Sequence, residues 1–245
     1  MRLTGYGARE WGGGGVLALL ALGGAAYLYL KVDQTAGIVV ASVVALVYFC
    51  VAAFFRDPKR RVPEEPTVLV SPADGVIRDI ELLKSEDENE FFDGNGVVRV
   101  GIFLSVLDVH LNRAPCEMEV EKRFYKEGAF HDARNPKASK ENESMTVFCR
   151  GKIEDSEFPL IIRQISGAIA RRIVCQADSG QSYSKGERFG MIKFGSRTEL
   201  FLPAESWMRV EVKVGDRVFA GETVVAKVVA KGDGAEEEEG KEEGS

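Results

Sequence analysis

Three short segments of this 245-residue chain carry side chains that could act as a nucleophile, a base or an acid. They are residues 71–75 (SPADG), 103–115 (FLSVLDVHLNRAP) and 188–197 (RFGMIKFGSR). Asp74, His110 and Ser196 supply a carboxylate, an imidazole and a hydroxyl, which are the groups that activate a serine nucleophile when they meet in space. Each segment also has an ordinary structural explanation. An aspartate before a glycine is typical of a turn, and a lone histidine at a strand end is commonly a hydrogen-bonded structural residue.

Other familiar catalytic patterns do not occur. The sequence has no GxSxG elbow, no P-loop, no GxGxxG after an expected strand and no HExxH. Its four cysteines are widely spaced without a CxxC pair, which argues against a zinc or disulfide framework. Only two histidines are present, His110 and His131, so we predict no metal site.

The charge is concentrated at the C-terminus. Of the net charge of −6, residues 235–245 contribute −5, from six glutamates and one lysine. We therefore predict a disordered acidic tail over residues 231–245. The rest of the chain is close to neutral, which gives no electrostatic footprint for nucleic acid, and we predict no nucleic-acid partner.

Two apolar runs precede the three segments in the chain. Residues 11–30 and 36–55 are each 20 residues long and free of charged side chains. A helix rises 1.5 Å per residue, so each could cross the ~30 Å hydrocarbon core of a bilayer. The first run opens with WGGGG, which favours a firm helix only over residues 16–30. The short connection at 31–35 predicts an antiparallel transmembrane hairpin, and the anchor as a whole is expected to cover residues 1–62.

Positive charge predicts the orientation of this hairpin. Basic residues precede the first run and follow the second at once, and they favour the cytoplasmic side. The predicted location is therefore the cell membrane, with the soluble domain in the cytoplasm. The cluster after the second run is a stop-transfer signal and could also hold the domain at anionic headgroups. Its members, which we predict to lie at the membrane surface, are Arg56, Lys59, Arg60 and Arg61.

The remainder, residues 63–230, reads as a succession of short β segments separated by glycine and proline. Residues 208–214 alternate apolar and polar side chains, as expected of a half-buried strand. Residues 132–144 are polar and contain a proline, which favours a loop. The predicted fold class is a mainly β domain, sandwich or barrel-like with short helices, on an N-terminal transmembrane helical hairpin. The expected strands are 67–70, 76–83, 97–105, 118–125, 145–150, 160–166, 188–194, 198–202, 208–214 and 223–229, with 168–175 ambiguous between strand and helix.

Taken together and in this order, the three segments resemble the phosphatidylserine decarboxylase family. The similarity begins at FFRDPKRRVP after the apolar runs, passes through SPADG, FLSVLDVHLNRAP and RFGMIKFGS, and reaches VKVGDRVFAGETVVA near residue 226. It is closest to the short branch of the family, which includes enzymes acting on archaetidylserine. The resemblance implies a membrane-bound decarboxylase of a serine phospholipid, and it leaves open phosphatidylserine or archaetidylserine as the substrate.

The resemblance also implies how such a proenzyme matures. The cleavage site would be Gly195–Ser196: the Ser196 hydroxyl attacks the Gly195 carbonyl, and the chain splits into a β chain (1–195) and an α chain (196–245). Ser196 would become a pyruvoyl group, the covalent cofactor, which forms a Schiff base with the substrate amine before CO₂ leaves. A homodimer of the processed enzyme is left open.

The resemblance assigns roles to further residues, and at one position this sequence departs from the pattern of the family. Asp74 matches the aspartate of the family's self-cleavage set, and His110 is the candidate proton donor to the substrate Cα. The larger branch uses a second histidine for self-cleavage at the position occupied here by Arg113, and a guanidinium is a poor base. Either His110 serves both steps or the base lies elsewhere, with His131 as a distant alternative. Arg113 becomes a candidate for binding the substrate headgroup.

Two other functions are compatible with parts of the sequence. Residues 212–222 (VKVGDRVFAGE) resemble the turn of biotinyl or lipoyl carrier domains, which would make the chain a membrane-tethered carrier or adaptor. Such a carrier needs a lysine at a hairpin tip, and Lys193 is the nearest candidate. The other alternative is a structural membrane protein on an inactive enzyme scaffold.

Overall fold

The computed structural model describes residues 2–83, 90–94, 96–135, 137–154, 156–168, 172–193 and 196–229. The chain divides into two compact units, Met1–Lys59 and Arg60–Ser245. The predicted acidic tail at 231–245 lies outside the described residues, and so does Pro136 of the predicted loop.

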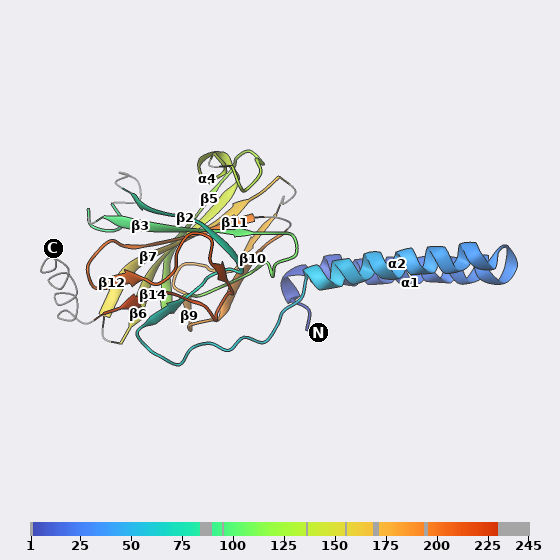
Figure 1. Ribbon diagram of the computed structural model, residues 1–245, viewed down its shortest axis with the longest axis horizontal. Coiled ribbons are helices and arrows are strands. Elements are labelled where there is room, and N and C mark those ends of the chain that lie inside the picture. Colours follow the sequence, from blue (N-terminus) through green and yellow to red (C-terminus); the bar gives the residue numbers. More distant parts are fainter. Residues whose placement is uncertain are drawn as a thin grey trace, which may run out of the picture. The chain divides into compact units, whose positions relative to one another are not determined.

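The first unit is a helical hairpin (Figure 1). A short 3₁₀ turn, η1 (Gly5–Gly7), leads into α1 (Ala8–Lys31), and α2 (Gln34–Phe54) follows after a two-residue connection. The Asp33 carboxylate accepts a hydrogen bond from the Ala36 backbone N–H at 2.7 Å and so caps the start of α2. Both helices are long and apolar enough to cross a membrane. The predicted pair of apolar helices is confirmed.

The first helix begins earlier than the WGGGG sequence suggested, because α1 includes all four glycines. Packing between the helices explains part of this tolerance. A Cβ at Gly15 would lie 3.1 Å from the Tyr48 hydroxyl, and one at Gly37 would lie 2.5 Å from the Tyr29 Cβ. Small residues therefore let α1 and α2 approach closely, which is the packing that apolar helices use in membranes.

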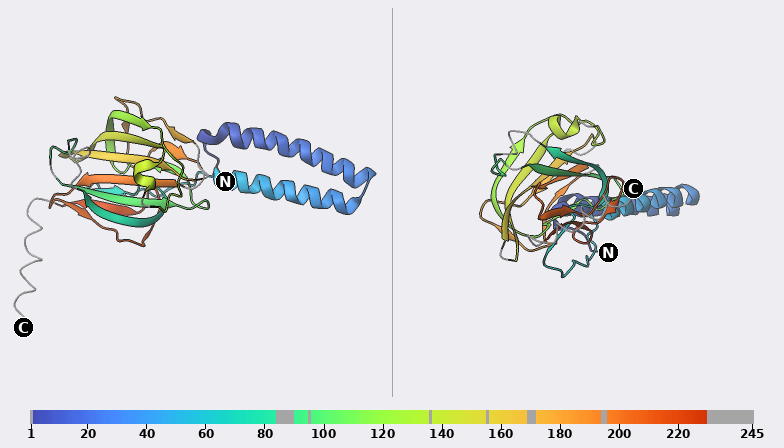
Figure 2. Two further views of the ribbon diagram at one scale, coloured as in Figure 1. Left: turned by 90° about the horizontal axis from the view of Figure 1, so that it is seen from above. Right: turned by 60° about the vertical axis from the view of Figure 1, so that its left-hand side comes forward.

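The second unit is built from three antiparallel sheets (Figures 1 and 2). The largest has the strand order β13-β2-β3-β11-β7-β6-β5-β9, and the small ones have the orders β4-β10-β8 and β1-β14-β12. The mainly β prediction is confirmed, and the sheets stay open. The elements of this unit are β1 (Val68–Val70), β2 (Gly75–Leu83), β3 (Val97–Leu104), β4 (Leu111–Arg113), β5 (Glu117–Lys126), α4 (Ala138–Glu141), β6 (Ser144–Ile153), β7 (Ser156–Ser166), β8 (Ile173–Cys175), β9 (Ser182–Tyr183), β10 (Arg188–Ile192), β11 (Ser196–Pro203), β12 (Met208–Val210), β13 (Arg217–Val218) and β14 (Val224–Val228).

Each strand expected from the sequence is present, with some changes of length. The alternating run at 208–214 forms a strand only as far as Val210, and Val214 is exposed. The strands that the sequence did not predict, β4, β9 and β13, have two or three residues each, too few for a periodic pattern to show. The segment 168–175 contributes the short strand β8, and the predicted loop 132–144 contains the single-turn helix α4.

One hydrophobic core joins residues from the three sheets, including Leu69 of β1, Ile102 of β3 and Phe189 of β10. Strand β11 runs through the middle of the large sheet and is buried on both faces. Leu200 and Leu202 point into this main core, whereas Phe201 belongs to a second cluster on the opposite face. Because side chains alternate along a strand, Ser196 and Thr198 share the face of Leu200, and Arg197 and Glu199 share the face of Phe201.

Candidate active site

Ser196 is the first residue of β11 and is fully buried. It pairs with Leu104 at the end of β3 and with Ser166 at the end of β7, so it lies where three central strands meet an edge of the sheet. Among the described residues its Oγ has no hydrogen-bond partner. A buried hydroxyl without a partner is costly, so such a group calls for an explanation, and a catalytic role is one that accounts for it. The other half of the predicted cleavage site, Gly195, lies outside the described residues.

His110 lies beside the strand that leads to Ser196. The backbone N–H of Ile192, in β10, donates to the His110 carbonyl at 3.1 Å, and only residues 193–195 separate Ile192 from Ser196. The imidazole is fully buried, and its Nδ1 lies 2.9 Å from the Asp108 backbone carbonyl. A carbonyl oxygen only accepts, so Nδ1 carries the hydrogen of this bond. In the neutral ring, Nε2 is then the nitrogen with a lone pair, which is the tautomer that a base requires.

A buried polar bridge fixes the two sheets in this region. Asn112 in β4 donates from Nδ2 to the Thr198 Oγ1 at 3.0 Å, and Gln164 in β7 donates to the Asn112 Oδ1 at 2.8 Å. His110 lies two residues before Asn112, and Ser196 lies two residues before Thr198. The bridge therefore brings the second and third sequence segments to the same end of the sheets. The sequence alone does not single out these amides, because nothing in an isolated Asn or Gln shows which strand it will face.

The SPADG segment joins the same group through its backbone. The Pro72 carbonyl accepts hydrogen bonds from the Asn112 Nδ2 at 3.3 Å and from the Arg113 backbone N–H at 3.0 Å. Gly75 is required here, because its φ of +152° and the Phe103 carbonyl, 2.1 Å from where a Cβ would lie, both exclude other residues. The structure thus brings all three segments together.

The Asp74 carboxylate itself faces Arg60. Its two oxygens lie 2.8 and 2.7 Å from the Arg60 Nη2, and its Oδ1 also accepts from the Ala220 backbone N–H at 2.8 Å. Burial raises the pKa of Asp74, and the charge of Arg60 opposes that rise. The basic cluster predicts Arg60 at the membrane surface, but the Arg60 side chain is only 7% exposed and forms this ion pair. Arg60 is therefore part of the site's scaffold.

Asp108 is a second buried carboxylate that the sequence analysis passed over. Its Oδ2 accepts from the backbone N–H and the hydroxyl of Ser105, each at 2.8 Å, and its Oδ1 forms an ion pair with Arg217. Its backbone carbonyl is the partner of His110. The spacing Ser-x-x-Asp was a usable signal, because an aspartate commonly hydrogen-bonds across such a turn.

The remaining candidates lie in different surroundings. The Arg113 guanidinium is buried and donates to the Gly186 carbonyl at 2.9 Å, and its Cδ lies 3.0 Å from where a Cβ on Gly221 would be. His131 is exposed, and its Nε2 lies 3.0 Å from the Glu141 carboxylate. Of the other basic residues expected at the membrane surface, Arg56 donates to the Ala53 carbonyl at 2.8 Å, whereas Lys59 and Arg61 are exposed.

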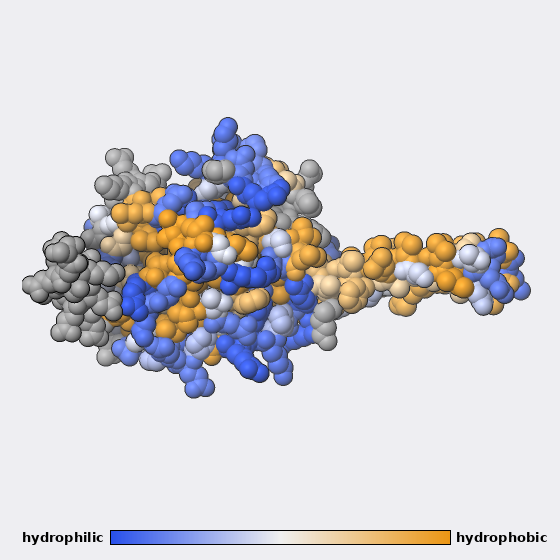
Figure 3. All heavy atoms as spheres, viewed as in Figure 1, coloured by the Kyte–Doolittle hydropathy of each residue, from blue (hydrophilic) through white to orange (hydrophobic). Residues whose placement is uncertain are grey.

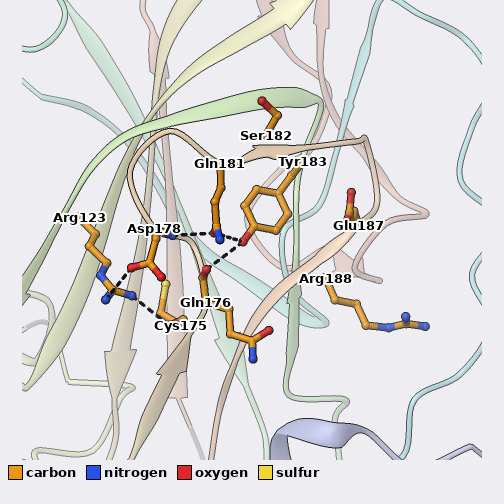
Figure 4. Close-up of a pocket in the computed structure, with 9 residues that line it drawn as sticks. All are labelled: Arg123, Cys175, Gln176, Asp178, Gln181, Ser182, Tyr183, Glu187 and Arg188. Atoms are coloured by element: carbon orange, nitrogen blue, oxygen red, sulfur yellow. Dashed lines mark hydrogen bonds and ion pairs between the residues drawn. The ribbon is translucent and has the colours of Figure 1, made fainter.

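A separate polar hollow lies between the end of β8 and the start of β10 (Figure 4). Arg123 and Asp178 form an ion pair of 2.7 Å on one side of it, and the Tyr183 hydroxyl bonds to the Gln176 carbonyl. Asp74, His110 and Ser196 do not belong to its lining. The residues that line it are Arg123, Cys175, Gln176, Asp178, Gln181, Ser182, Tyr183, Glu187 and Arg188.

Comparison with known proteins gives one consistent result. Residues 47–226 match the family model of phosphatidylserine decarboxylase. The chain is 40% identical to a phosphatidylserine decarboxylase proenzyme of Symbiobacterium thermophilum over 211 residues, which cover 86% of this chain and 91% of the relative. It is 40% identical to the proenzyme of Carboxydothermus hydrogenoformans over 185 residues (76% and 83%), and 43% identical to that of Ehrlichia chaffeensis over 173 residues (71% and 73%). The carrier or adaptor alternative finds no support among these matches.

Proposed function

This chain belongs to the phosphatidylserine decarboxylase family, and we propose that it is a proenzyme that cuts itself at Gly195–Ser196 and then decarboxylates a serine phospholipid. The observation that carries the proposal is the buried Ser196 Oγ, which has no hydrogen-bond partner among the described residues. A reaction that consumes this hydroxyl explains why the protein keeps it in the interior without a partner. The substrate is phosphatidylserine or its ether-lipid counterpart archaetidylserine.

Self-cleavage uses Ser196 as the nucleophile. Its Oγ attacks the Gly195 carbonyl carbon, the peptide C–N bond breaks, and an ester replaces the amide while the Ser196 amine becomes free. Removal of the Cα proton of residue 196 then expels the Gly195 carboxylate. Water displaces the nitrogen as ammonia, which leaves a pyruvoyl group at the start of the α chain (196–245) and an ordinary carboxylate at the end of the β chain (1–195).

His110 is the proposed base for these proton transfers. Its Nδ1–H is committed to the Asp108 carbonyl, which leaves Nε2 as the nitrogen that can accept a proton. Its backbone bond to Ile192 holds it beside the segment that is cut. Arg113 occupies the position of a second histidine in the larger branch of the family, and here its guanidinium bonds to the Gly186 carbonyl. A single histidine serving both self-cleavage and Cα protonation fits this arrangement.

The surroundings of Ser196 fit a pyruvoyl group, which is the group that self-cleavage leaves at this position. A pyruvoyl group carries no charge and lacks the hydroxyl, so conversion removes the one polar atom at position 196 that lacks a partner among the described residues. Its carbonyl supplies an electron sink for the electrons that CO₂ leaves behind. Among the protein's own residues, His110 is the one that returns a proton to the substrate Cα.

Asp74 is proposed to position these groups. Its bonds to Arg60 and to the Ala220 N–H hold the 71–74 turn, and the Pro72 carbonyl in that turn holds Asn112. Asn112 in turn holds Thr198, two residues beyond the nucleophile. Arg113 stays a candidate for contacting the headgroup phosphate only if its side chain moves from the Gly186 carbonyl.

The two apolar helices support a membrane location, and the basic residues flanking them favour a cytoplasmic catalytic domain. The exposed side chains of Lys59 and Arg61 support a role for these two cluster members in contacting anionic headgroups. A homodimer of the processed enzyme is also compatible with the sequence.

Intact mass spectrometry of the purified protein, together with CO₂ release from phosphatidylserine, tests the proposal. We expect two chains of 195 and 50 residues, the smaller with a blocked N-terminus and lighter by the mass of one ammonia than a chain that begins with an intact serine. A single unmodified chain would contradict self-cleavage. A small chain that begins with a readable Ser-Arg-Thr-Glu sequence would mean ordinary proteolysis.

A further inference from the structure

The turn that follows β3 carries an unusual pair of side chains. Residues 105–108 are closed by the Asp108 N–H bonding to the Ser105 carbonyl at 2.9 Å, and by the Asp108 carboxylate bonding back to Ser105. The two central positions of such turns normally hold glycine, asparagine, aspartate or proline. Here they are Val106 and Leu107. Leu107 is 83% exposed, more than any other large hydrophobic side chain that the structure describes.

This exposure is imposed by the fold. Three hydrogen bonds close the turn, and the Asp108 carboxylate is further held by Arg217, so the apolar tip is fixed in place. Val106, next to Leu107, is also exposed (47%). Exposed apolar groups that lie together, unlike single exposed side chains, mark surfaces that bind a partner or a membrane.

The surroundings of the turn indicate a lipid surface. Arg217 stands beside the tip with its side chain 56% exposed, whereas its partner Asp108 is only 2% exposed. The carboxylate is therefore turned inward and the guanidinium outward, so the positively charged end of the pair is the one that faces solvent. The Arg217 guanidinium lies 5.9 Å from the centre of the exposed Phe219 ring. Aliphatic, aromatic and arginine side chains together are the composition of proteins that dock at a bilayer interface.

We propose that Val106, Leu107, Phe219 and Arg217 form a membrane-docking surface that inserts into the bilayer containing the substrate. The proposal rests on the proposed function, and it adds the place where the catalytic unit meets the lipid. Leu107 lies three residues before His110, so the tip and the proposed proton donor are within about 10 Å along the chain. A lipid at this surface would have its headgroup close to His110 and its acyl chains in the membrane. Figure 3 shows that one face of this unit carries apolar patches between hydrophilic residues.

The sequence also favours a bilayer as the partner. Only residues 55–59 lie between the end of α2 and Arg60, whose side chain bonds to Asp74. The six residue steps from Phe54 to Arg60 span no more than about 22 Å even when fully extended. If α2 crosses the membrane, the second unit is held near the surface, where an exposed leucine meets lipid before it meets a soluble partner.

The test compares two identical substitutions in full-length protein reconstituted into vesicles that contain phosphatidylserine. Leu107→Asp is the test variant. Leu82→Asp is its control, because Leu82 is also exposed (63%) and lies near the opposite end of β2 from Gly75. Both are assayed for CO₂ release on bilayer substrate and on a short-chain phosphatidylserine dissolved below its micelle concentration, after mass spectrometry shows complete processing. We expect Leu107→Asp to lower turnover about tenfold or more on bilayer substrate, to leave the soluble substrate unaffected, and Leu82→Asp to change neither.

Equal losses on both substrates would overturn the proposal, because the turn would then act only through His110. No loss on either substrate would overturn it too. A change from dimer to monomer in Leu107→Asp would assign the surface to a second copy of the chain instead.

A second measurement does not depend on activity. A fluorophore attached to Leu107→Cys in a Cys50→Ser background should be quenched by nitroxide-labelled lipids, and one attached to Leu82→Cys should not. Absence of quenching at position 107 would refute docking even if the decarboxylase activity is present. Quenching without any decarboxylation would support docking and contradict the proposed function.

Discussion

The guanidinium of Arg197 crosses over Gly101 to reach Asp79, two strands away in the large sheet. Its Nη2 lies 2.7 Å from the Asp79 Oδ1, and a Cβ on Gly101 would lie only 2.1 Å from that nitrogen. Its Nε also donates to the fully buried Glu199 at 2.8 Å. Arg197 directly follows Ser196, so this ion-pair cluster fixes the strand that would become the new end of the α chain.

Gly101→Ala should therefore destabilise the protein. The added methyl group displaces the guanidinium and weakens the pairing of a buried carboxylate, which costs on the order of 3–5 kcal/mol. We expect a clear fall in the thermal unfolding temperature of the full-length protein in detergent. Arg197→Met should have a similar effect because it also removes a partner of Glu199.

Arg209→Met is the matched control for Arg197→Met. Arg209 and Glu211 form an ion pair of 2.6 Å with the same spacing along the α chain, but the Arg209 side chain is 57% exposed. Surface pairs of this kind contribute about 0–1 kcal/mol, so this variant should unfold close to the wild-type temperature. Equal effects of the two substitutions would show that the buried cluster has no special role.

The same cluster predicts a dependence on pH. Burial alone would raise the pKa of Asp79, but the hydrogen bonds and charges of Arg197 and Arg99 together hold it below its usual value of 3.8. A carboxyl with a lowered pKa in the folded state adds stability above its unfolded pKa and loses it as the pH falls through the folded value. The difference in unfolding temperature between wild type and Asp79→Asn should thus be full above about pH 4 and shrink below it. A constant difference over this range would contradict the assignment.

Ser196→Ala should leave a single chain of 245 residues with no decarboxylase activity, because the nucleophile and the precursor of the pyruvoyl group are both lost. The variant should remain folded, since the lost hydroxyl has no hydrogen-bond partner among the described residues. Gel electrophoresis and intact mass measure processing, and thermal unfolding measures stability. Normal cleavage of Ser196→Ala would place the cut elsewhere.

His110→Ala distinguishes one role for this histidine from two. If His110 serves self-cleavage and Cα protonation, the variant should accumulate as uncut proenzyme. If it serves only protonation, the variant should be processed and inactive, as shown by two chains on a gel without CO₂ release. Rapid processing combined with full activity would exclude His110 from the chemistry.

Arg60→Gln should slow self-cleavage, and Arg61→Gln should not. Arg60 bonds to both oxygens of the buried Asp74 carboxylate, whereas the exposed Arg61 meets Glu222 through its backbone N–H, which the substitution keeps. Without Arg60 the pKa of Asp74 should rise further, because the charge that opposes the effect of burial is lost, and the 71–74 turn would lose one of the two groups that hold it. Pulse-chase labelling measures the half-time of cleavage, and equal half-times in the two variants would remove Arg60 from the scaffold of the site.

Local patterns in the sequence were sufficient to predict the helices, the strands and the family. Two uncharged runs of 20 residues predicted the helices, and alternation such as that at 208–210 predicted strands of the β unit, because periodicity and composition reflect which face of an element is buried. The motifs around Asp74, His110 and Ser196 predicted the family, which the comparisons confirm. Residues 208–214 mark the limit of this reasoning, because the alternation continued after the strand had ended.

Which side chains contact one another depends on how the strands assemble. Arg60 looked like one member of a basic cluster, and folding pairs it with Asp74, 14 residues along the chain. Asn112, Thr198 and Gln164 look ordinary in sequence, but they form the buried bridge that brings His110 and Ser196 to one end of the sheets. Such partners come from strands far apart in the chain, and strand order and register determine their contacts. A local pattern encodes the burial of a residue, whereas the identity of its partner depends on the folding of the whole domain.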